Sequence, residues 1–124
     1  MKQIRQRFAT NWIGFWDDWK VFMVVFFAAL LADALSTIHF MRYEGVEAEM
    51  HPMVNLVSRR IGPVWGPLVG ALSKAAAGVI AAVYFRRIAG FIFGLSSLIS
   101  VWAAWFNLWG YRVYEPNIYV WWPF

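Results

Sequence analysis

Two ionisable side chains stand inside long apolar runs of this sequence, and they are the first candidates for chemistry. Asp33 lies in the run from 21 to 41, and Lys74 lies near the middle of the run from 63 to 85. A charge at the centre of a membrane-spanning helix costs about 2.5–3.5 kcal/mol on insertion scales, so each one needs a partner or a role. The two residues fall at similar depth if these helices pack antiparallel, so we expect an intramembrane ion pair.

This pair of Asp33 and Lys74 has two main interpretations. The first is architectural, since a buried pair fixes how two helices dock. The second is chemical, a proton relay or a substrate anchor, because buried and paired ionisable groups recur at functional sites. A neutral member of the pair, or a partner on another chain, is a further alternative. We favour the architectural interpretation.

A second polar group gathers at the end of the first run and in the loop after it. Its candidate metal ligands are His39, Glu47, Glu49 and His51, and Asn107 falls at the same end of the third run. Two imidazoles with one or two carboxylates suit a divalent metal such as zinc, iron or copper. The alternative, which we favour, is an interfacial histidine beside a solvated charged loop. A haem or chlorophyll on a single histidine is less favoured still.

Cysteine is absent from the 124 residues, which excludes disulfides, thiolate zinc sites, iron–sulfur clusters and covalently attached haem. The net charge of +4 would suggest nucleic acid in a soluble protein, but here the basic residues stand at the ends of apolar runs. We therefore expect no nucleic-acid partner.

Membrane-spanning helices must carry these side chains. The chain is 61% hydrophobic, 20% aromatic and 15% charged, against about 25% charged in an average soluble domain. A chain this short cannot hide so much apolar surface within itself. The runs are too long for barrel strands. The expected fold class is all-α, an integral membrane protein with about three transmembrane helices and an amino-terminal interfacial amphipathic helix.

Six segments are expected along the chain. They are an interfacial amphipathic segment (1–20), a first span (21–41), a polar loop with a short surface helix (42–62), a second span (63–85), a third span (88–110) and an aromatic interfacial tail (111–124). The first segment is predicted as one helix because its aromatic residues share a face: Phe8, Trp12, Phe15, Trp16 and Trp19. The brief break at Arg86 and Arg87 predicts an antiparallel hairpin of the last two spans.

Small residues recur at helical spacing on the second and third spans, where they let another helix approach closely. The predicted packing positions are Gly66, Gly70, Gly78, Ala82, Gly90 and Gly94. Lys74 falls within the first of these stripes, so we expect its charge to point at protein.

The basic residues predict the orientation. With three spans, the amino-terminal segment and the turn at 86–87 share one side and hold six basic residues, against four on the other side. The positive-inside rule then predicts a cytoplasmic amino terminus and an outer carboxyl terminus, with a bacterial inner membrane as the default.

The sequence DALST at 33–37, then Gly45, EMHPM at 49–53, Gly62 and Lys74 resemble an uncharacterised family of short prokaryotic multi-pass membrane proteins. That family's pattern has an Asp and a Thr one turn apart in a first span, then a Gly, a Glu-x-Asn-Pro motif and a Lys in the next span. His51 stands where the pattern has Asn, and the matching positions are Asp33, Thr37, Gly45, Glu49, Pro52 and Lys74. The resemblance implies a polar constellation between the first two helices and no particular activity.

Two functions fit these residues. The first is a non-catalytic accessory or assembly subunit of a larger membrane complex, with membrane lipid and other integral membrane subunits, or further copies of the chain, as partners. The second is a small metal-binding membrane enzyme or metal-handling protein that uses an intramembrane cluster: Asp33, His39, Glu49, His51 and Lys74. The chain carries no motif of known chemistry, so we favour the first, which is not an enzyme, and leave the second open.

Overall fold

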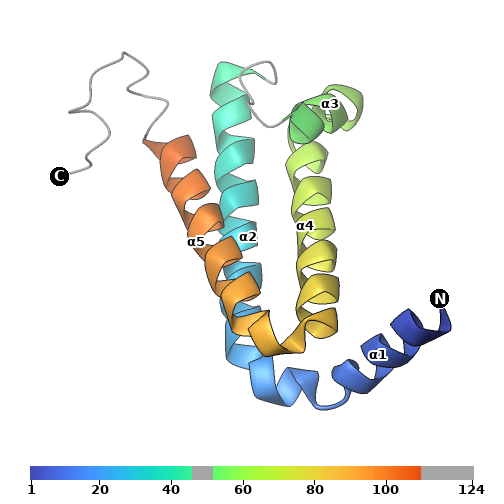
Figure 1. Ribbon diagram of the computed structural model, residues 1–124. Coiled ribbons are helices and arrows are strands. Elements are labelled where there is room, and N and C mark those ends of the chain that lie inside the picture. Colours follow the sequence, from blue (N-terminus) through green and yellow to red (C-terminus); the bar gives the residue numbers. More distant parts are fainter. Residues whose placement is uncertain (46–51, 110–124) are drawn as a thin grey trace.

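The computed structural model describes residues 1–45 and 52–109 of the chain, and these residues form an all-helical fold with no strand (Figure 1). The elements are α1 (Lys2–Trp12), α2 (Phe15–Glu44), α3 (Pro52–Ile61), α4 (Trp65–Tyr84), the 3-10 turn η2 (Arg86–Ile88) and α5 (Ala89–Leu108). The all-α prediction is confirmed, and the short helix expected after the first span is present as α3.

Three of these helical segments are long and apolar enough to cross a membrane. They are Phe15–Arg42, Trp65–Tyr84 and Arg86–Leu108. The last two form the expected antiparallel hairpin around η2, and α2 lies beside α5 along much of its length (Figure 1). This arrangement is compatible with an integral membrane protein of three spans.

The amino-terminal segment departs from the prediction of one helix over 1–20. The helix ends after Trp12, and Gly14, with φ of +69°, begins a new helix at Phe15. A left-handed φ is easily adopted by glycine and breaks helical hydrogen bonding. The first span helix therefore begins six residues before the predicted boundary at 21, and only Lys2–Trp12 stands apart. Aromatic contacts from Trp12 to Phe15 continue across the break, so aromatic spacing alone gave no sign of it.

Arg86 ties α1 to the turn between α4 and α5. Its guanidinium donates to the backbone oxygens of Asn11 and Ile13, at 2.9 and 2.8 Å, and pairs with the Asp18 carboxylate. Arg7 adds a cation–π contact, 4.4 Å above the ring of Tyr84. The amino-terminal segment and the turn thus lie at the same end of the bundle, as expected (Figure 1). The membrane face that this end meets stays a prediction.

An aromatic core fills the half of the bundle nearest η2. The rings of Phe26 and Phe93 lie 5.2 Å apart, and that of Phe15 lies 6.1 Å from Phe93. Smaller side chains from α4 and α5 complete the cluster, including the fully buried Val83 and Ala89. This apolar packing sets the spacing of the three long helices, and polar residues begin beyond it.

Most of the predicted small packing positions lie at helix contacts. A Cβ on Gly66 would overlap Ser58 of α3, and one on Gly78 would come within 2.5 Å of Phe26 of α2. The remaining contacts join Gly70 to Val54, Gly90 to Trp19, and the fully buried Ala82 to the core. The stripe on α4 therefore packs on the surface helix α3 at one end and on α2 at the other.

Gly94 does not lie at a helix contact within the described chain, so its packing role stays a prediction. A Cβ added there would have no atom within 4 Å. The buried residues of α5 form a different stripe, which consists of Ala89, Phe93, Ser97, Ser100 and Ala104. Gly94 follows Phe93 and is therefore rotated away from that stripe by about 100°.

Candidate functional site

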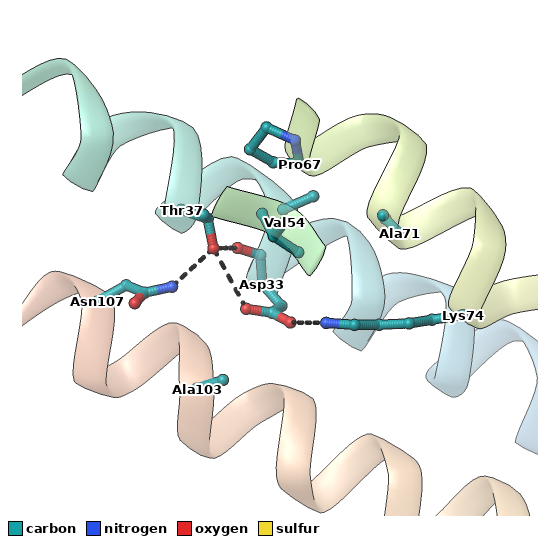
Figure 2. Close-up of a pocket in the computed structure, with 10 residues that line it drawn as sticks. Asp33, Thr37, Val54, Pro67, Ala71, Lys74, Ala103 and Asn107 are labelled. Atoms are coloured by element: carbon teal, nitrogen blue, oxygen red, sulfur yellow. Dashed lines mark hydrogen bonds and ion pairs between the residues drawn. The ribbon is translucent and has the colours of Figure 1, made fainter. Parts of the chain in front are cut away.

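A polar pocket lies between α2, α4 and α5 in the half of the bundle away from η2 (Figure 2). Its volume is about 120 Å³, and its polar lining is Asp33, Thr37, Lys74 and Asn107. Most of the remaining walls are small residues of α4 and α5, such as Gly70, Ala71 and Ala103, with Val54 of α3 at one edge. Each long helix thus contributes at least one polar group.

The ion pair expected from the sequence is present. Lys74 Nζ lies 3.2 Å from Asp33 Oδ2, a distance that serves both as an ion pair and as a hydrogen bond. The two partners differ in burial, since 12% of the Asp33 side chain is exposed but 42% of the Lys74 side chain. Lys74 therefore points at protein only in part, and the carboxylate is the enclosed member of the pair.

Local helical geometry holds the Asp33 backbone. Thr37, one turn later on α2, donates from Oγ1 to the Asp33 backbone oxygen at 2.8 Å and lies 3.5 Å from Asp33 Oδ1. Ser36 Oγ donates to the same backbone oxygen at 2.9 Å. Such back-bonding to an earlier carbonyl is the common way for a hydroxyl to be satisfied within a helix.

Asn107 joins α5 to this network (Figure 2). Its Nδ2 donates to Thr37 Oγ1 at 2.8 Å and to Ser36 Oγ at 3.2 Å. Both hydroxyls donate their hydrogens to the Asp33 backbone oxygen, so their oxygens accept hydrogen bonds from Asn107. This fixes the orientation of the amide and leaves its Oδ1 as an acceptor without a hydrogen bond in the described chain. Polar contacts thus run from Lys74 of α4 through α2 to α5.

Asn107 lies at a different place from the one that the sequence predicts. We expected it beside His39 at the end of the bundle, but it bonds to Ser36 and Thr37, nearly one turn deeper on α2. The sequence does contain one usable signal, because an amide in an apolar run must find a partner, and the hydroxyls of the DALST segment are the nearest polar groups at that depth.

The predicted metal ligands are not brought together in the described residues. His39 is partly buried in α2, whereas Glu47, Glu49 and His51 lie outside the described residues. Across residues 1–45 and 52–109, no group of three His, Asp or Glu side chains is placed to hold a metal ion. The metal site therefore stays a prediction that depends on Glu47, Glu49 and His51.

The resemblance stated above implies a polar constellation between the first two spans, and three of its positions meet in this pocket: Asp33, Thr37 and Lys74. Of the other three, Pro52 begins α3, Gly45 ends α2 with φ of +86°, and Glu49 lies outside the described residues. No family model, curated protein or solved structure matches this chain. The family assignment therefore stays a prediction.

Proposed function

We propose that this chain is a non-catalytic accessory or assembly subunit of a larger complex of integral membrane proteins, with its amino terminus in the cytoplasm of a bacterium. The proposal is carried by the exposure of Lys74. This residue is the tenth of the 20 residues of α4, yet 42% of its side chain is exposed. An ammonium group facing hydrocarbon at that depth costs about 2.5–3.5 kcal/mol. A second chain that covers α4 at this point removes the cost.

The surface of α4 beside Lys74 supports the same proposal. Ser73 and Ala77 are small and exposed. Small residues at four-residue spacing let helix backbones come close, which is the main source of attraction between helices in lipid. The role of the Asp33, Thr37 and Asn107 network in this proposal is architectural, since it holds three helices at a fixed spacing for the partner.

The test is a mild-detergent purification of the tagged full-length chain from its own membrane, with mass spectrometry and elemental analysis of the same sample. The expected result is a stoichiometric integral membrane partner and no stoichiometric metal. Ala77→Leu should reduce recovery of the partner at least tenfold, because a branched side chain blocks close approach. Ala32→Leu places the same change on an exposed position of α2 and should leave recovery unchanged.

Two outcomes would contradict the proposal. In the first, the chain purifies alone. In the second, it carries a stoichiometric metal that disappears in His51→Ala, which would favour the metal-handling function. Loss of the partner in both leucine variants would show only a general effect of bulk, so the comparison of Ala77→Leu with Ala32→Leu decides whether α4 is the contact.

A further inference from the structure

The pocket is electrically balanced. The Asp33 carboxylate and the Lys74 ammonium are 3.2 Å apart and sum to zero charge. Among the described residues that line the pocket, these two are the ionisable ones. A charged group brought in by another molecule would therefore leave a net charge in a low-dielectric site, where unpaired charges are most costly. The group that fits is neutral.

Hydrogen-bonding capacity nevertheless remains unused on two sides of the pocket. An ammonium group has three N–H donors, and within the described part of the chain Lys74 donates only to Asp33. The NH2 group of Asn107 donates to Ser36 and Thr37, which leaves its Oδ1 as an acceptor. A group that both accepts and donates would satisfy both residues. A carboxylate has no hydrogen to donate, and a hydrocarbon chain has neither function.

The size and walls of the pocket favour a side chain delivered by a helix. A volume of about 120 Å³ is well above the roughly 10–15 Å³ that a single water needs, so the pocket has room for a small polar side chain. Ala71 on α4 and Ala103 on α5 line the pocket with little bulk, so another helix backbone can come close. The exposure of Lys74 leaves one side of the pocket accessible from outside the chain.

We infer that the partner helix inserts a neutral polar side chain, one of Asn, Gln, Ser or Thr, into this pocket, where it accepts from Lys74 and donates to Asn107. The inference rests on the proposed function, because it names the chemistry of the subunit that covers Lys74. It also gives the ion pair a second role, since Asp33 cancels the charge of Lys74 and leaves its hydrogens available for a neutral partner.

The test is photo-crosslinking of the full-length chain in its own membrane. A diazirine amino acid is placed at Ala103, on the pocket wall, and in a separate sample at Leu98, which is 70% exposed on another face of α5. Crosslinked peptides are then identified by mass spectrometry. Position 103 should react with a span of the co-purifying partner within one helical turn of an Asn, Gln, Ser or Thr. Position 98 should give at least fivefold less of that product.

Replacement of the identified partner residue by Leu gives a second readout. It should reduce recovery of the complex at least tenfold, as should Lys74→Met, while Lys74→Arg should retain most of it because donors remain. The inference is overturned if a partner co-purifies but position 103 reacts only with lipid or a small molecule. It is equally overturned if the product lies beside a charged residue or only apolar residues. The absence of any partner would instead refute the proposed function.

Discussion

Removal of one member of the Asp33 and Lys74 pair should cost more than removal of both. Lys74→Met leaves a carboxylate that is only 12% exposed and that retains, among residues 1–45 and 52–109, only the 3.5 Å contact from Thr37. Breaking a buried pair by removal of one partner costs about 3–5 kcal/mol, and we expect a loss of about 3 kcal/mol here. Asp33→Leu leaves the ammonium unpaired near the middle of α4, which should cost about 2.5–3.5 kcal/mol.

The double variant Asp33→Leu with Lys74→Met removes both charges and keeps much of the side-chain volume. Apolar replacement of a whole buried pair is often nearly neutral, so we expect a total cost of about 1 kcal/mol or less. The double-mutant cycle should therefore show a coupling free energy of at least about 2 kcal/mol in favour of the native pair. This coupling free energy measures how much each charge stabilises the protein through the presence of the other.

The measurement is the free energy of unfolding in dodecyl maltoside micelles titrated with SDS, followed by circular dichroism and by the fluorescence of the nine tryptophans. Lys20→Met, at an exposed position near the start of α2, is the matched control and should change stability by less than about 0.5 kcal/mol. If the two single changes add to the double change within about 0.5 kcal/mol, the charges act independently and the architectural interpretation of the pair fails.

Three further predictions follow from the packing and the turn. Gly78→Leu should lower the free energy of unfolding in the same titration by about 1–3 kcal/mol, because its Cβ meets a Phe ring of α2 at 2.5 Å. Gly94→Leu faces open space and should lower the free energy of unfolding by less than about 0.5 kcal/mol. Equal losses of stability in the Gly78 and Gly94 variants would contradict the placement of Gly78 at a helix contact and of Gly94 away from one. Arg86→Met should speed hydrogen exchange in Lys2–Trp12 severalfold while leaving α5 protected, and unchanged exchange in α1 would show that its contacts to the turn do not hold it. Since the chain contains no cysteine, Gln3→Cys and Met53→Cys should label from opposite faces of intact membrane vesicles, and labelling from one face would refute three spans.

Much of the fold follows from composition and from distance along the chain. The apolar runs are too long and too many for this chain to bury within itself, so they predict spanning helices, and the three candidate spans overlap the predicted ranges. The rise per residue along a helix gives the depth of each side chain. Depth alone was enough to pair Asp33 with Lys74 across 41 positions of sequence.

The parts that escaped prediction depend on rotation about the helix axis and on local backbone geometry. The helix break at Gly14 is a single backbone angle, and the aromatic pattern continues through it. Gly94 has the same residue type and spacing as the packing glycines but lies off the buried stripe of α5. Hydropathy and residue spacing are the same whether or not the helix breaks at Gly14, and whether Gly94 faces a neighbouring helix or open space.

The sequence by itself determined that the chain is helical, where its apolar segments lie, and that two opposite charges share one depth. The tertiary structure alone decided that Asn107 joins them, that Asp33 is enclosed and that Lys74 is left partly exposed. The physical reason is that the large aromatic side chains of the core, such as Phe26 and Phe93, set the rotation and separation of the helices. That geometry opens a pocket in the other half of the bundle, and only three-dimensional packing reveals which hydrogen-bonding groups are left facing it.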